Sequence, residues 1–194
     1  MEQKHIKPGK IIIFSAPSGS GKTTILNRVR EQYTNLKFSV SCTTRLPREN
    51  EVDGIDYKFI TEEEFKQKID NDEFVEYEEV YPGQFYGTLK SAVNEKLDLG
   101  IDVAFDVDIH GGLNIKRIYG EQALAVFIQP PSIEELRRRL EKRGTDSAEV
   151  IKTRIERAAY ELSRANEFDT IVVNDDLETA VKDALEVVGN FLNS

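Results

Sequence analysis

The residues whose types and spacing most clearly suggest chemistry are Lys22 and Thr23, which follow a glycine-rich stretch at 15–21. The pattern Gly-x-Gly-Lys-Thr lies between β-forming residues at 10–14 and a segment from residue 25 with helical apolar spacing. Strand, glycine-rich turn and helix in this order suit a phosphate-binding loop, because backbone N–H groups and the helix dipole then converge on one anion. Lys22 would reach the β- and γ-phosphates of a nucleotide, and the Thr23 hydroxyl would bind Mg²⁺.

One position departs from the usual form of this loop. The pattern Gly-x-x-x-x-Gly-Lys-Ser/Thr places glycine at position 16, where the chain has Ala16. The alternative is a surface turn rich in glycine and serine that precedes an ordinary helix. Because strand, turn and helix agree, we predict an ATP-binding loop formed by Ala16, Pro17, Ser18, Gly19, Ser20, Gly21, Lys22, Thr23 and Thr24.

Asp106 is a candidate second ligand for the metal. It follows an apolar run at 101–105, and an acid at the end of a buried strand can hold Mg²⁺ directly or through water. Taken alone, Asp106 could equally cap a helix or stabilise a turn. The loop upstream favours the metal role, so the sequence predicts Mg²⁺ at Thr23 and Asp106.

Composition limits the classes of partner. The chain has 194 residues and a net charge of −9, whereas a general nucleic-acid binder is usually basic. No stretch approaches the roughly 20 apolar residues of a membrane span, and the N-terminus lacks the apolar centre of a signal peptide. Cys42 is the only cysteine, so an internal disulfide is impossible. We expect a cytoplasmic protein with neither nucleic acid nor membrane as a partner.

Apolar segments alternate with helical patterns along most of the chain. Continuous apolar strands are predicted at 10–14, 101–105, 124–128 and 170–173. Helices are predicted at about 23–33, 132–142, 148–166 and 177–192. Strands that are apolar throughout and alternate with helices predict an α/β fold, a parallel sheet with helices on both faces.

The segment at 39–94 breaks this alternation. Short strands are predicted at 38–41, 56–60 and 73–81 around a helix at 61–69, and a further helix at 93–99 follows this segment. Thr61 and Glu64 have the spacing of a capping box at the start of the first of these helices. Short strands around one helix predict an inserted α+β subdomain.

Two basic clusters could hold anions against the unfavourable overall charge. The clusters are Arg45 with Arg48, and Arg137, Arg138 and Arg139 with Lys142 and Arg143. Guanidinium groups bind phosphate in bidentate fashion, and the hydroxyls of Tyr57 and Tyr86 in the same subdomain could add donors. The residues alone leave open a solvated basic loop around Arg45 that binds nothing.

Several motifs, in one order, resemble those of the guanylate kinase family. They occupy residues 15–22, 39–48, 54–57, 74–77, 86–88, 106–111, 130–132, 143–145 and 173–176. The resemblance covers the chain from about residue 10 to residue 180. Linked motifs are far more specific than the loop alone, and alanine at the position of Ala16 also occurs in this family.

The resemblance implies a nucleoside monophosphate kinase that transfers the γ-phosphoryl group of ATP to GMP, and to dGMP, with Mg²⁺. It implies a P-loop NTPase-type sheet with a nucleotide-monophosphate-binding subdomain and a mobile lid. Within one domain over 1–194, the core would comprise about 1–38 and 95–194, the GMP-binding subdomain 39–94 and the lid 137–157. Whether the protein is a monomer or a homo-oligomer is left open.

The resemblance also implies roles for single residues. The GMP-binding residues would be Ser41, Glu76 and Thr88 at guanine, Arg45, Arg48, Tyr57 and Tyr86 at the phosphate, and Gly87 and Asp108 on the same side. The catalytic residues at the transferring phosphoryl group would be Lys22, Arg45, Arg139, Arg143 and Arg154. Asn174 would lie near the adenine of ATP.

The chemistry of Glu76 agrees with guanine as the base. Guanine presents N–H donors at N1 and N2, which a carboxylate can accept together, whereas adenine offers an acceptor at N1. Without the resemblance, Glu76 could be an ordinary surface residue of a strand. Family members often carry serine at the position of Thr88, and threonine keeps the hydroxyl. They often carry glutamine at the position of His110, so we expect His110 to be a structural residue.

Two other functions remain as alternatives. One is a catalytically inactive guanylate kinase-like scaffold that binds phosphopeptides, although such domains typically have degraded phosphate loops and Gly21, Lys22 and Thr23 are intact. The other is a related P-loop kinase with a different phosphorylated substrate. Glu76 together with Ser41 favours guanine.

Overall fold

The structure, a computed structural model, describes residues 7–144 and 147–194. The chain forms two compact units, and each is described by itself. The larger unit consists of Ile11–Asn35 and Ala104–Ser194, and the smaller unit of Leu36–Val103 with the residues that precede Ile11. The predicted boundaries of the GMP-binding subdomain at 39–94 and of the lid at 137–157 stay predictions.

A five-stranded sheet has the strand order β2-β7-β1-β8-β9. Its strands are β1 (Ile11–Ser15), β2 (Leu36–Phe38), β7 (Asp102–Asp106), β8 (Ala123–Gln129) and β9 (Thr170–Val173). β8 pairs in parallel with β1, from Ile11 opposite Ala123 to Ser15 opposite Phe127, and on its other edge with β9. All five residues of β1 are buried, as expected for a strand covered on both faces.

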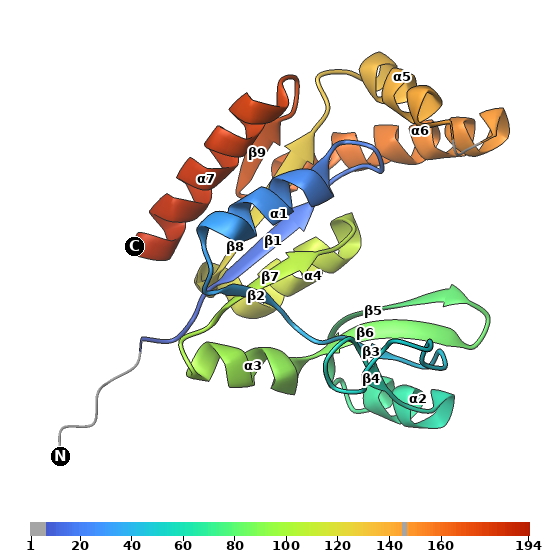
Figure 1. Ribbon diagram of the computed structural model, residues 1–194, viewed down its shortest axis with the longest axis vertical. Coiled ribbons are helices and arrows are strands. Elements are labelled where there is room, and N and C mark those ends of the chain that lie inside the picture. Colours follow the sequence, from blue (N-terminus) through green and yellow to red (C-terminus); the bar gives the residue numbers. More distant parts are fainter. Residues whose placement is uncertain (1–6, 145–146) are drawn as a thin grey trace. The chain divides into compact units, whose positions relative to one another are not determined.

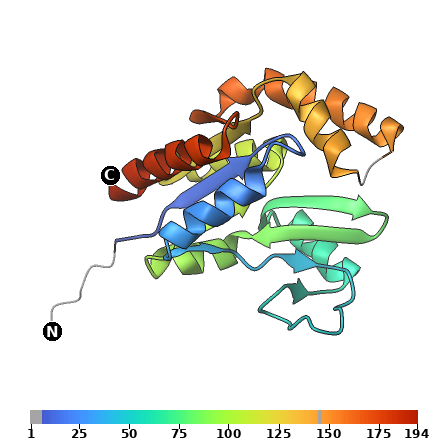
Figure 2. The ribbon, with the colours of Figure 1, turned by 45° about the horizontal axis from the view of Figure 1, so that its top comes forward.

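Helices cover both faces of this sheet in the larger unit (Figure 1). The helices against the strands are α1 (Lys22–Gln32), α4 (Ile109–Tyr119) and α7 (Leu177–Asn193), and the larger unit also contains α5 (Ile133–Arg143) and α6 (Ala148–Ser163). α1 and α7 lie side by side, and the Tyr33 hydroxyl after α1 donates to the Leu185 carbonyl at 3.0 Å. α5 and α6 pack through Leu136, Leu140, Ile151, Ile155 and Ala158, and their ribbons run together in Figure 2. The predicted α/β class with a parallel sheet is confirmed.

Helix α4 was missing from the sequence prediction. Its sequence contains Gly111 and Gly112, and glycine lowers helix propensity by about 1 kcal/mol per residue relative to alanine. Asp108 caps the helix, accepting from the Gly111 N–H at 2.9 Å, and this bond offsets part of the cost of the glycines. A Cβ at Gly112 would lie 3.3 Å from the Ile13 side chain, so the glycine lets α4 approach β1 closely.

The predicted strand at 38–41 was wrong. The strand of this region is β2, and Ser39, Val40 and Ser41 are outside any strand. Leu36 is buried while Phe38 is 37% exposed, so the apolar contact that fixes the strand lies nearer its start than the sequence indicated. The Ser41 hydroxyl lies 3.1 Å from the Thr88 hydroxyl.

The smaller unit contains a four-stranded sheet of order β4-β3-β6-β5. Its elements are β3 (Cys42–Thr43), β4 (Lys58–Phe59), α2 (Glu62–Asp70), β5 (Phe74–Tyr81), β6 (Gln84–Leu89) and α3 (Lys90–Asp98). β6 is antiparallel to both β3 and β5. The predicted capping box at α2 is confirmed, since the Thr61 side chain accepts from the Glu64 N–H and Glu64 from the Thr61 N–H.

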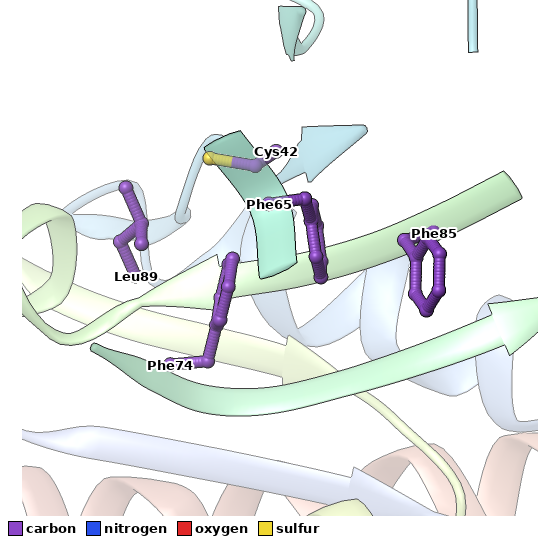
Figure 3. Packing of buried hydrophobic residues seen from close by; sticks show 5 residues of the cluster. All are labelled: Cys42, Phe65, Phe74, Phe85 and Leu89. Atoms are coloured by element: carbon purple, nitrogen blue, oxygen red, sulfur yellow. The ribbon is translucent and has the colours of Figure 1, made fainter. Parts of the chain in front are cut away.

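One apolar cluster stabilises this sheet against α2. Phe65 of α2 is fully buried and stacks on Phe74 and Phe85 at ring-centroid distances of 4.3 and 5.2 Å. Cys42 and Leu89 complete the cluster (Figure 3).

No helix within the described part of the chain combines the length and the apolar composition needed to cross a membrane.

Phe65→Ala should lower the free energy of unfolding by about 3–5 kcal/mol, because it removes the central ring of the cluster and leaves a cavity. Leu46→Ala is the control, since Leu46 is 84% exposed and its truncation should cost less than about 0.5 kcal/mol. Urea denaturation followed by circular dichroism measures both. Equal destabilisation by the two variants would contradict the assignment of this core.

Candidate functional site

The loop between β1 and α1 has the form expected of a phosphate-binding loop. The backbone φ angles of Gly19 and Gly21 are 93° and 89°, a left-handed region that glycine enters without a steric penalty. Between them, the Ser20 N–H donates to the Pro17 carbonyl at 3.1 Å and closes a turn. Helix α1 begins at Lys22, so its first N–H groups and its positive dipole end adjoin the loop.

A pocket of about 950 Å³ lies over this loop in the larger unit. Its lining consists of residues 16–24, Asp106, Asp108, Arg139, Leu140, Arg154, Arg157 and Glu161. The structure thus brings together the whole predicted loop, the predicted Mg²⁺ ligand Asp106 and two of the predicted catalytic arginines, Arg139 and Arg154. A Cβ on Gly19 would lie 2.9 Å from the Leu140 side chain, so α5 packs directly on the loop.

Lys22, Thr23 and Asp106 form one connected group in the pocket. Lys22 Nζ lies 2.6 Å from Asp106 Oδ1 and donates to the Val107 carbonyl at 3.0 Å. The Thr23 hydroxyl lies 3.5 Å from Asp106 Oδ2. β7 ends at Asp106 and therefore positions this carboxylate beside the start of α1. A hydroxyl and a carboxylate this close are the oxygen ligands that suit Mg²⁺.

Asn174, predicted to lie near adenine, binds the loop itself. It follows β9 and is 5% exposed, and its Nδ2 donates to the Ser20 carbonyl at 2.7 Å. Its backbone N–H donates to the Gln129 carbonyl at 2.7 Å, which ties it to the end of β8. The Asn174 amide therefore holds the loop in shape, while its contact with adenine stays a prediction.

The predicted catalytic arginines of the larger unit have different surroundings. Arg139 donates to Glu135 at 2.8 Å and to the Asn174 carbonyl at 3.0 Å, and it lies beside the loop. Arg154 donates to the Ser18 hydroxyl at 2.6 Å. Arg143 is the last residue of α5, and its side chain lies outside the described parts of the structure. Hydrogen bonds from Arg138 and Arg139 lower the pKa of Glu135 to about 2.

Two pocket residues on α6 were missed in the sequence. Arg157 donates to Glu161 at 2.9 Å and to Asp108 at 3.2 Å, which links α6 to the start of α4. Glu161 is 5% exposed, and burial raises its pKa above the usual value although the bond from Arg157 acts in the opposite direction. Arg157 and Glu161 are one helical turn apart, a pattern too common on helix surfaces to identify them beforehand.

The smaller unit gathers the three residues predicted to contact guanine. Glu76 of β5 lies opposite Thr88 of β6 in the sheet register. The Thr88 hydroxyl is buried and lies 3.1 Å from the Ser41 hydroxyl. A Cβ on Gly87 would lie 2.8 Å from the Tyr77 Cβ, so glycine at this position lets the two strands approach closely.

The residues predicted to bind the GMP phosphate surround Arg45. Its Nε donates to the Tyr86 hydroxyl at 3.1 Å, and its guanidinium lies over the Tyr57 ring at 5.4 Å from the centroid. Arg48 is exposed on the same loop. Sequence reasoning missed Glu51, which binds Arg45 through both carboxylate oxygens at 2.8 Å. The spacing of an acid six residues after an arginine in a loop carries no signal by itself.

Asp108 lies in the larger unit, as the cap of α4 and a partner of Arg157. Its predicted contact with GMP stays a prediction. His110 packs on Tyr160 with ring centroids 6.0 Å apart, and Arg164 Nη1 lies 3.4 Å from its Nδ1. These contacts hold the His110 imidazole between α4 and α6. They account for this histidine as a structural residue.

Gly21→Ala should reduce the affinity for ATP at least tenfold. The left-handed backbone would be strained by about 1–2 kcal/mol, and the new Cβ would collide with the Asn174 amide that holds the loop. Gly54→Ala is the control, since Gly54 also has a positive φ, 77°, but open space around it. Calorimetric titration with ATP distinguishes them, and retained affinity in the Gly21 variant would refute the role given to this position.

Comparisons with known proteins identify the family of this chain. A family model described as guanylate kinase matches residues 8–190. The chain is 59% identical over 183 residues to a guanylate kinase of Bacteroides fragilis, covering 94% of this chain and 90% of the relative. It is 57% identical over 185 residues to one of Bacteroides thetaiotaomicron, covering 95% and 91%. The crystal structure of guanylate kinase from Anaplasma phagocytophilum matches with a TM-score of 0.69 and 30% identity, covering 97% of this chain and 88% of that one. The chain belongs to the guanylate kinase family of enzymes.

Proposed function

We propose that this protein transfers the γ-phosphoryl group of ATP to GMP, and to dGMP, giving ADP and GDP. The observation that carries the proposal is the pairing of Glu76 and Thr88 in the sheet of the smaller unit, with the Ser41 hydroxyl 3.1 Å from that of Thr88. A carboxylate and two hydroxyls in one place match the hydrogen-bonding edge of guanine better than that of the other bases. The family relationship supports the same substrate class.

The base would be read by complementary hydrogen bonds. The Glu76 carboxylate accepts from the N1 and N2 hydrogens of guanine, and a neighbouring hydroxyl donates to O6. Adenine would place its N1 acceptor against the same carboxylate, and the two acceptors repel each other. A site that leaves a buried polar group unpaired with the wrong substrate discriminates strongly against that substrate.

The phosphate loop would bind the triphosphate of ATP. Its N–H groups and Lys22 carry positive charge toward the β- and γ-phosphates, where negative charge accumulates during transfer. Thr23 and Asp106 would hold Mg²⁺, and the proximity of their oxygens supports this assignment. Bound there, Mg²⁺ supplies further positive charge to the phosphate oxygens.

The Lys22 ammonium has three hydrogens, so it can donate to a phosphate oxygen while it contacts Asp106 and the Val107 carbonyl. Arg139 and Arg154, beside the loop, would neutralise the transferring group. No catalytic base is required, because a phosphomonoester is largely dianionic above its second pKa of about 6. This agrees with the structural surroundings of His110.

The direct test is a coupled assay of ADP release with a panel of nucleoside monophosphates and sugar phosphates. We expect GMP and dGMP to be the efficient substrates, with AMP, CMP and UMP far behind. Efficient turnover of another phosphorylated compound would indicate the related kinase instead. Absence of turnover with every compound, in protein that binds a phosphopeptide, would indicate the scaffold.

Lys22→Ala should lower kcat with GMP by at least about 10³-fold, because it removes a preorganised charge from the transferring phosphate. The fold should persist, since Lys22 is partly exposed and its main contacts are made at the site. Lys66→Ala is the control, a lysine of α2 with 58% of its side chain exposed. Near-normal turnover of the purified Lys22 variant would contradict the proposed function.

Glu76→Gln should lower kcat/KM for GMP about tenfold or more and raise AMP relative to GMP. The amide keeps the shape but offers one acceptor and one donor, and a paired base contact is worth ~1–3 kcal/mol of discrimination. Glu63→Gln on the exposed face of α2 is the control. A GMP/AMP ratio equal to that of the unaltered protein would exclude Glu76 as the base reader.

A further inference from the structure

Arg45 is bound on almost every side in this structure. A guanidinium has five N–H donors in a rigid fork. Within the described residues, four of them have acceptors: Nε binds the Tyr86 hydroxyl, one Nη1 hydrogen binds the Leu46 carbonyl, and the hydrogens between Nη1 and Nη2 bind Glu51. The Glu51 carboxylate occupies the end of the fork that would otherwise give the usual bidentate contact with a phosphate.

The remaining donor lies on a defined edge. It is the outer hydrogen of Nη2, which points along the same edge of the fork as the Nε hydrogen. The Tyr86 hydroxyl lies on that edge and accepts from Nε, so its own proton is available to donate. Arg45 and Tyr86 together can therefore offer two parallel donors to one phosphate while Glu51 stays in place.

Glu51 is built into the loop. Its carboxylate also accepts from the Arg48 N–H at 2.8 Å, and its own N–H donates to the Arg48 carbonyl at 3.0 Å. Only 17% of its side chain and 12% of that of Arg45 are exposed. The bonds from Arg45 and Arg48 lower the pKa of Glu51 to about 2, so the carboxylate is ionised at neutral pH.

We propose that Glu51 is a positioning residue for the GMP phosphate: it fixes the Arg45 fork so that its Nε–Nη2 edge, with the Tyr86 hydroxyl, faces the phosphate. Glu51 does not touch the substrate and acts through Arg45. This inference rests on the proposed function and deepens it, since it names a further determinant of how the phosphate of the acceptor nucleotide is bound.

A rival arrangement makes the opposite prediction. If Glu51 instead occupied the place of the phosphate, GMP would have to displace it, and removing its charge would strengthen GMP binding. Three hydrogen bonds from one loop, all at 2.8 Å, and low exposure favour a fixed carboxylate. The sign of the change in GMP affinity therefore separates the two arrangements.

The experiment compares Glu51→Gln with Glu49→Gln, an exposed neighbour in the same loop. Calorimetry measures the dissociation constants of GMP and of guanosine, which lacks the phosphate, and steady-state kinetics gives KM and kcat. For Glu51→Gln we expect GMP to bind about tenfold more weakly, guanosine to change less than about twofold, and KM for GMP to rise far more than kcat falls. Glu49→Gln should behave as the unaltered protein.

A double-mutant cycle tests whether Glu51 acts through Arg45. In the Arg45→Ala background, Glu51→Gln should change GMP affinity less than about twofold, because the group it positions is gone. Tighter GMP binding by Glu51→Gln, or equal loss of GMP and guanosine, would overturn the inference. If the unaltered protein turns over GMP and Glu51→Gln binds it normally, only the inference fails. If the unaltered protein does not use GMP at all, the proposed function fails as well.

Discussion

The hydrogen bond from the Asn174 amide to the Ser20 carbonyl is the contact on which the nucleotide pocket depends. It fixes the loop at the point where two left-handed glycines reverse the backbone, and it leaves no room for a side chain at Gly21. Asn174 is placed by the end of β9, and the loop by the end of β1. The register of β8 with both strands therefore sets the geometry of the loop.

The same edge of the sheet supplies the charged partners. Asp106 ends β7, and in a parallel sheet the carboxyl ends of neighbouring strands open on one side, where ligands of α/β proteins bind. The protein carries a net charge of −9, whereas its proposed substrates are polyanions. It places its cations beside acids that hold them in position: Lys22 with Asp106, Arg45 with Glu51, Arg139 with Glu135 and Arg157 with Glu161. Because these cations are already held in place, their side chains need less rearrangement when an anion binds. Each acid, however, neutralises part of the positive charge of its partner.

The sequence was informative where a local pattern and the tertiary fold agree. The apolar run of β1, the glycines and Lys22 predicted the strand, loop and helix, and Thr61 with Glu64 predicted the start of α2. It failed where contacts between residues far apart in the sequence determine the local structure. Helix α4 contains Gly111 and Gly112 and forms against β1, which no local propensity reveals.

The missed site residues share one physical reason. Glu51, Arg157 and Glu161 are ordinary charged residues in ordinary positions, and they matter only for the groups that folding brings to them. Asn174 was recognised from a motif, but its bond to the loop needed the structure. A sequence motif identifies residues by type and spacing. A residue that acts by fixing a neighbouring side chain is identified only from its contacts in the structure.

The residues proposed to read guanine also depend on a contact between strands. Glu76 and Thr88 lie opposite each other only because β5 and β6 approach closely at Gly87, where a methyl group would meet Tyr77. A bulge between Phe74 and Glu76 shifts the register of β5 at the start of this pairing. Bulges redirect side chains and recur beside binding sites. In the proposed function, discrimination between guanine and adenine would therefore depend on the geometry of the sheet as well as on the acid itself.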